Sequence, residues 1–182
     1  LKPSEVRKSP KAQQAILDEA GKLVRVGCWD TSVVKEWADV ARDYRARGEV
    51  VHVGRVFPVS SIKNWELPED HPDRKDKGRL VFQGNFVKDG RGKFAIFEET
   101  SAAPTSMEGS RSCDAYGLQD PEFVIESADA EQAYPQAKPD GPDTFLRLPV
   151  ELQPPQWSKF HDPFTLMLQN LYGHPSAGHW WE

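Results

Sequence analysis

The chain has 182 residues, of which 38% are hydrophobic and 28% are charged, and its formal net charge is −5. This length accommodates one ordinary domain with a small core, and no stretch approaches the roughly 18 apolar residues of a membrane-spanning helix. Its two cysteines, Cys28 and Cys113, exclude a disulfide scaffold and predict a reducing, intracellular location, cytoplasmic or nuclear. The start, Leu1–Glu5, lacks an initiator methionine and an apolar signal segment, and we expect a piece of a longer polypeptide.

The charge is distributed unevenly along the chain. Residues 1–48 and 49–100 carry net charges of +3 and 0, whereas residues 101–182 carry 4 Lys or Arg against 12 Asp or Glu, a net charge of −8. An acidic last third argues against a protein that coats nucleic acid through surplus cations. It leaves two interpretations open, which are a cation-binding site and a solubilising acidic surface.

The first 48 residues predict two helices. Ser9 as a cap, followed by Pro10, indicates the start of a helix, and Gly27 marks its end. A second apolar stripe with helical spacing predicts a helix that is capped by Thr31 or Ser32 and ends at Gly48.

From residue 49 the pattern changes to that of strands. Residues 50–57 and 79–83 are rich in β-branched and aromatic side chains and predict two strands. The stretch 58–76 between them is rich in proline and charge and predicts a loop. A turn within residues 89–92 and a short strand over 94–97 follow.

The last third is predicted to mix strands with a helix. We expect a helix over 106–118, a strand over 123–129 that ends on a carboxylate, and a strand over 144–148. The stretch 164–171 is predicted to be partly helical. Two helices followed mainly by strands indicate an α+β fold.

Four short motifs occur in order from residue 77 onward. They are KGRLVFQG at Lys77–Gly84, Thr100–Pro104 followed by Arg111, SADAEQAY at Ser127–Tyr134, and Leu171–Gly173 followed by Trp181. Each resembles a motif of the reverse transcriptase of copia-type retrotransposon polyproteins, respectively K-A-R-L-V-A-[KR]-G, T-F-A-P with a later Arg, D-V-x-x-A-F, and L-Y-G-L-K-Q-A-P-x-x-W. The resemblance extends over about residues 10–182.

The resemblance implies a right-hand polymerase of which this chain contains the fingers and part of the palm. The fold expected is α+β, a mostly antiparallel sheet with flanking helices, divided into an N-terminal helical segment (1–48), fingers (49–121) and a partial palm (122–182). The family's paired aspartates are absent, because no Asp-Asp dipeptide occurs in the sequence. The implied function is RNA-directed DNA polymerisation by an intact parent, and we expect the isolated chain to be inactive.

The resemblance also implies a metal site. Nucleotidyl transfer uses two Mg²⁺ ions, which prefer hard oxygen ligands. Asp129 stands where the family has its first metal-binding aspartate, and the carbonyl of Ala130 is the implied additional ligand. Apart from the resemblance, an aspartate at this point predicts a turn cap.

Four further residues are implied to bind substrate. Lys77 and Arg79 alternate on a predicted strand and can face the same triphosphate, although a charged edge strand is the alternative. Tyr134 stands where the family has the aromatic residue that rejects a 2′-hydroxyl, and a core tyrosine is the alternative. Gly173 permits close backbone approach. We expect Asp129 to end a central antiparallel strand and to share a cleft with Lys77 and Arg79.

Some residues depart from the family pattern. Pro135 follows Tyr134, Gln83 replaces a cation, and His174-Pro175 removes basic character from the last motif. Two alternatives therefore stay open, a degenerate non-catalytic remnant and a module that binds nucleic acid or protein on the same scaffold. The partners implied for the parent are an RNA or DNA template-primer, a deoxynucleoside triphosphate (dNTP), and the remainder of the polyprotein with palm, thumb and RNase H. No membrane partner is expected.

Overall fold

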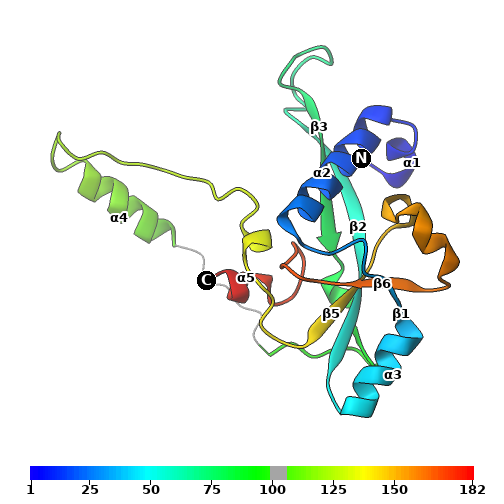
Figure 1. Ribbon diagram of the computed structural model, residues 1–182. Coiled ribbons are helices and arrows are strands. Elements are labelled where there is room, and N and C mark those ends of the chain that lie inside the picture. The colour runs from blue at the N-terminus through cyan, green and yellow to red at the C-terminus, as the bar shows by residue number, and fades with distance from the viewer. Residues whose placement is uncertain (99–105) are drawn as a thin grey trace.

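A computed structural model describes residues 1–98 and 106–182. Within these residues the chain forms a mixed α/β fold in which helices flank a six-stranded, mostly antiparallel sheet (Figure 1). This confirms the predicted combination of a mostly antiparallel sheet with flanking helices. The fingers and palm remain a prediction, as do the segment boundaries, although strands from all three predicted segments join this one sheet.

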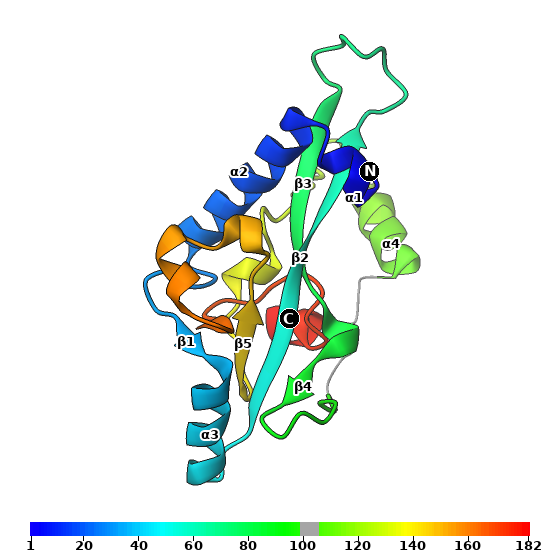
Figure 2. The ribbon, with the colours of Figure 1, turned by 90° about the vertical axis from the view of Figure 1, so that its right-hand side faces the viewer.

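The sheet is organised around β2 (Val51–Lys63), which runs almost the full length of the molecule (Figure 2). Along the sheet the order is β1-β6-β5-β2-β3, and β4 also pairs with β2. The other strands are β1 (Lys35–Glu36), β3 (Lys75–Phe82), β4 (Lys88–Asp89), β5 (Asp143–Arg147) and β6 (Pro163–Leu166). Among the strand pairs of the described residues, β2–β5 is parallel and the others are antiparallel.

The described part of the chain contains five α-helices and four 3₁₀ turns. The helices are α1 (Pro3–Val6), α2 (Pro10–Val26), α3 (Trp37–Arg47), α4 (Met107–Gly117) and α5 (Ala177–Trp181). The 3₁₀ turns are η1 (Gly84–Phe86), η2 (Tyr134–Gln136), η3 (Val150–Leu152) and η4 (Pro155–Lys159). None of the helices is long and apolar enough to cross a membrane.

The predicted start and end of α2 are confirmed. The Ser9 hydroxyl accepts a hydrogen bond from the Ala12 N–H at 3.2 Å, and Gly27 ends the helix with a left-handed φ of 86°. The predicted end of α3 at Gly48 is also confirmed, but its predicted start at Thr31 or Ser32 is wrong. The helix begins at Trp37 because the two residues before it pair with β6 as strand β1.

The predicted loop over 58–76 is wrong at both ends. Strand β2 continues to Lys63 and β3 already begins at Lys75, so the two strands form a long hairpin. Pro58 is tolerated because β5 pairs with β2 only as far as Arg55, which leaves β2 with one neighbour here. The predicted strand over 94–97 is reduced to one isolated bridge between Phe94 and Lys88.

The predicted strand over 123–129 is also wrong. The residues that follow Asp120–Pro121 run without regular structure and without a paired strand, and Phe123, Val124 and Ile125 are 44%, 81% and 49% exposed. The predicted helix before them is present as α4, capped by Ser106. This helix stands away from the sheet, and the chain returns from it through a long extended stretch (Figure 1).

Helix α2 covers one face of the β2–β3 hairpin. Gly78 faces this helix, and a Cβ at this position would lie 2.5 Å from the Ala15 carbonyl oxygen, so a side chain here would push the helix off the sheet. The main core lies beneath α2 and includes Leu23, Leu80, Phe82, Leu146 and Trp157. A smaller cluster beneath α3 contains Val40, Val51, Phe145 and Phe164.

Candidate functional site

The loop of the fourth motif runs along the edge of β3. The Phe82 N–H donates a hydrogen bond of 2.7 Å to the Tyr172 carbonyl oxygen. The next residue, Gly173, has a φ of 87°, and a Cβ there would lie 2.3 Å from the Phe82 carbonyl oxygen. Gly173 is therefore required for a close approach to β3, a structural reason that is independent of its predicted contact with substrate.

Three of the four motifs meet at the Tyr172 side chain. Its ring lies 5.1 Å from the Tyr134 ring, in a T-shaped arrangement, and 5.9 Å from the Arg79 guanidinium carbon. Arg79 belongs to β3 and Tyr134 begins η2. Residues that are far apart in sequence thus form one cluster, and Arg79 points from an exposed position on its strand.

Two carboxylates act electrostatically on the same tyrosine. Burial raises the pKa of the Tyr172 hydroxyl, the Arg79 cation opposes this, and the Glu19, Tyr134 and Asp129 anions raise it further. The Arg79 cation and the Asp129 carboxylate thus act with opposite sign on the pKa of one hydroxyl. We name Glu19, Arg79, Asp129, Tyr134 and Tyr172 the Tyr172 cluster.

Lys77 and Arg79 share one face of β3, as predicted. In the hairpin register Lys77 is opposite Ser61 and Arg79 is opposite Val59, and both cations are exposed. Lys77 lies closer to the tip of the hairpin, and no contact joins it to the Tyr172 cluster in the described part of the chain.

Asp129 and Ala130 lie on the unpaired stretch and are both exposed, so the prediction that Asp129 ends a central antiparallel strand is wrong. Carboxylate and carbonyl oxygens are ligand types that Mg²⁺ prefers. Two residues supply only part of its octahedral ligand set, and the described residues contain no group of three or more His, Cys, Asp or Glu that could hold a metal. Asp129 and Ala130 therefore offer the ligand types that Mg²⁺ prefers, but too few ligands to hold the ion by themselves.

Glu19 was not predicted as a site residue. It lies on α2, where the sequence shows only the apolar spacing of a helix, and its approach to Tyr172 depends on how α2 packs against β3. The second motif, Thr100–Pro104, lies outside the described residues. No protein-family model, curated protein or solved structure matches this chain.

Proposed function

We propose that the chain forms the fingers and the first part of the palm of an RNA-directed DNA polymerase, as the copia-type resemblance implies. The observation that carries this proposal is the Tyr172 cluster. Arg79, Tyr134 and Tyr172 come from three motifs separated by about 40 to 50 residues each, and their side chains meet at one place. The carboxylate of Asp129, from the same motif as Tyr134, acts electrostatically on the Tyr172 hydroxyl. Core packing does not require that such groups be brought together at the surface.

In the proposed reaction each residue has a separate task. Arg79, with Lys77 on the same strand face, neutralises the triphosphate of the incoming nucleotide. Tyr134 lies beneath the sugar, where its ring leaves no room for a 2′-hydroxyl. Asp129 and the Ala130 carbonyl hold magnesium, which when bound supplies charge stabilisation for phosphoryl transfer.

The exposed stretch 123–129 supports a palm that is completed by other strands. Phe123, Val124 and Ile125 are consecutive apolar residues in an extended stretch, and this pattern is typical of a strand that is buried on both faces of a sheet. In the proposed polymerase, strands from the remainder of the palm pair with this stretch and bring the paired aspartates to Asp129. The isolated chain is then expected to be inactive.

Pro135, which departs from the family pattern, is compatible with this function. It is buried at the start of η2, a position at which proline fits because its fixed φ matches the turn. The backbone after Tyr134 therefore accommodates the proline without a cis peptide bond.

Primer extension by the intact parent tests the proposal. The variant Asp129→Asn removes the charge that holds the metal and is expected to lower the extension rate at least on the order of a hundredfold. Glu131→Gln is the matched control, because Glu131 is an exposed neighbour whose contact in the described part of the chain is made by its backbone carbonyl, which accepts a hydrogen bond from the Gln136 side chain. Equal rates for Asp129→Asn and the parent would exclude the metal role and leave a non-catalytic remnant.

A further inference from the structure

A groove of about 400 Å³ lies on the sheet between α3, β2, β5, β6 and the stretch that follows β3. It is separate from the Tyr172 cluster. Three cations and three aromatic rings contribute to its walls, namely Trp37, Arg55, Phe86, Lys88, Arg147 and Phe164. We name it the Phe86 groove.

Two of the cations converge on one aromatic ring. The Arg55 guanidinium carbon lies 5.4 Å from the centre of the Phe86 ring, and the Lys88 Nζ lies 5.3 Å from it. In the described part of the chain no ion pair involves Arg55 or Lys88. The nearby Asp89 carboxylate accepts hydrogen bonds from the N–H groups of its own turn. The groove therefore offers two positive charges that have no ion-pair partner within residues 1–98 and 106–182.

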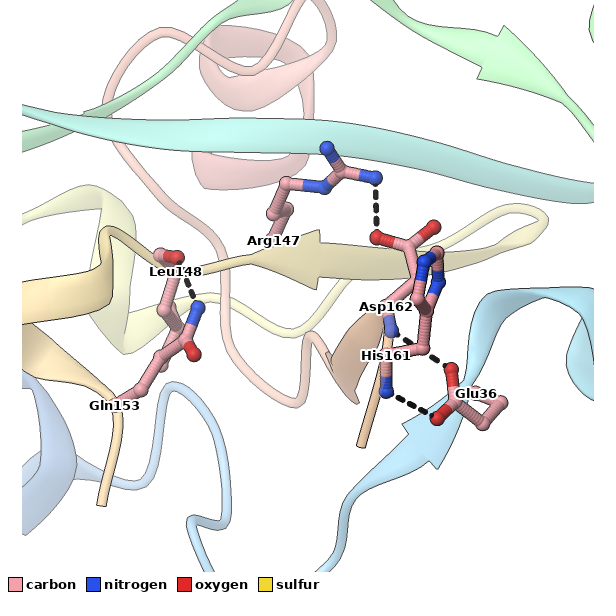
Figure 3. A network of polar contacts seen from close by, with 6 residues as sticks. All are labelled: Glu36, Arg147, Leu148, Gln153, His161 and Asp162. Atoms are coloured by element: carbon pink, nitrogen blue, oxygen red, sulfur yellow. Dashed lines mark hydrogen bonds and ion pairs between the residues drawn. The ribbon is translucent and has the colours of Figure 1, made fainter. Parts of the chain in front are cut away.

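The third cation is held in place by a network (Figure 3). The Glu36 carboxylate accepts hydrogen bonds from the N–H groups of His161 and Asp162, at 2.6 and 2.8 Å, and Asp162 forms an ion pair with Arg147. Arg147 lies beside Arg55 in the parallel register of β2 and β5, and its guanidinium carbon is 4.9 Å from the Phe164 ring. This wall of the groove is thus positioned before any ligand binds.

An exposed face of β2 leads from the groove toward the Tyr172 cluster. Arg55, Phe57 and Val59 alternate on this face, and Phe57 and Val59 are each 41% exposed. Val59 is opposite Arg79 in the hairpin. At about 3.3 Å for each residue of a strand, Arg55 and Val59 are about 13 Å apart.

We propose that the Phe86 groove binds a single-stranded nucleic acid. Cations along a groove contact the phosphates, and accessible aromatic rings stack with bases in a manner that tolerates any sequence. Phe86 is 39% exposed, and Phe94, 63% exposed, meets it edge-on at 5.4 Å. An acidic peptide would satisfy the cations but would not use these accessible rings. The inference goes beyond the proposed function, because a single-stranded nucleic acid can bind in the Phe86 groove whether or not Asp129 holds a metal.

Fluorescence anisotropy with a labelled oligothymidylate of about 12 nucleotides, a length within the usual site sizes, tests this inference on the whole 182-residue chain. The assay contains no divalent ion and no nucleotide, so its outcome is independent of the primer-extension test. Arg55→Gln and Lys88→Gln are each expected to weaken binding and to reduce the slope of log affinity against log salt by about 0.7. Phe86→Ala is expected to weaken binding on the order of tenfold.

Two matched controls separate the groove from the general surface. Lys22→Gln removes an exposed cation of α2, and Trp65→Ala removes an aromatic side chain that is 72% exposed at the hairpin loop. Both are expected to bind like the unmodified chain, and circular dichroism checks that every variant is folded. The inference is overturned if the unmodified chain does not bind at low salt, or if the controls weaken binding as much as the groove variants. It is also overturned if duplex DNA or polyglutamate binds equally well.

Discussion

His174 is a buried titratable side chain that should make the fold sensitive to acid. The side chain is packed among the rings of Phe82, Phe97 and Trp180, with centroid distances of 5.1, 5.4 and 4.5 Å, and the residue is only 4% exposed. Its Nδ1 accepts a hydrogen bond from the Ser176 N–H at 3.2 Å, whereas its Nε2 is buried without a hydrogen-bond partner among the described residues. Among the described residues, no anion contributes to the pKa of this ring.

Burial, together with the nearby His52, lowers the pKa of His174 from 6.5 to about 3. The surrounding rings favour a cation by about 0.5–2 kcal/mol, which is less than the cost of burying the charge. Because the folded-state pKa is lowered, stability is complete above the unfolded pKa of about 6.5 and is lost as the pH falls from there toward 3. Linkage predicts a loss of about 2 kcal/mol at pH 5 and at most about 5 kcal/mol.

Urea unfolding at several pH values between 8 and 5, followed by tryptophan fluorescence, measures this effect. The variant His174→Asn keeps an oxygen acceptor for the Ser176 N–H but does not titrate, so its stability should fall less than that of the unmodified chain. Part of the fall should persist, because burial also lowers the pKa of His52. His161→Asn, at an exposed position, should show the full fall. If His174→Asn loses as much stability as the unmodified chain, the reasoning is wrong.

Three further predictions concern the loop that contains Gly173, the Tyr172 cluster and the exposed stretch 123–129. Gly173→Ala should lower the free energy of unfolding by about 3 kcal/mol, because φ is left-handed and the new Cβ overlaps the Phe82 carbonyl. Gly92→Ala should lower it by only about 1 kcal/mol, because φ is left-handed there too but the space around it is open. Similar losses for the two variants in urea unfolding would contradict the overlap. Tyr134→Ala in the intact parent should raise the incorporation of ribonucleotides relative to deoxynucleotides on the order of tenfold, as measured by primer extension, and an unchanged ratio would exclude the steric role. Val124→Lys should change the stability of this chain by less than about 0.5 kcal/mol, because the side chain is 81% exposed. In the parent the same variant should lower the stability by about 2 kcal/mol or more. The control Val150→Lys, at a 78% exposed position, should not destabilise the parent in this way. Thermal unfolding of both proteins would decide this, and a neutral effect of Val124→Lys in the parent would contradict the completed palm.

The features that the sequence predicts well are those that short-range chemistry determines. Ser9 and Gly27 delimit α2 because a cap and a left-handed C-terminal residue act within one helical turn. The start of α3 could not be found in this way, since residues 35–36 are removed from the helix by pairing with β6, more than 120 residues away. The length of β2 likewise depends on its pairing with β3, which offsets the preference of Pro58 for a loop.

The residues of the candidate site also differ in how far the sequence predicts them. The order of the motifs led to the prediction that Arg79, Asp129 and Tyr134 act together, and this joint role stays a prediction. Of the three, Arg79 and Tyr134 lie against the Tyr172 ring, and the Asp129 carboxylate raises the pKa of its hydroxyl. Nothing in the sequence indicated Glu19. The Phe86 groove could not be predicted from the sequence either, because the register of the strands and the turn after β3 bring its cations together.

The stretch 123–129 lacks a neighbouring strand among the described residues. This explains why the strand prediction there is wrong, and the proposed polymerase requires such a neighbour. The side chains of Phe123–Ile125 favour a strand, yet propensity alone does not form one, since a strand needs a neighbour to satisfy its backbone groups. No described residue provides that neighbour, so the stretch stays unpaired and its apolar side chains stay exposed. The same neighbour would fix the direction of the Asp129 carboxylate, which belongs to the Tyr172 cluster and is exposed at the surface. Folding of this stretch and formation of a metal site at Asp129 are therefore expected to depend on the same added strands.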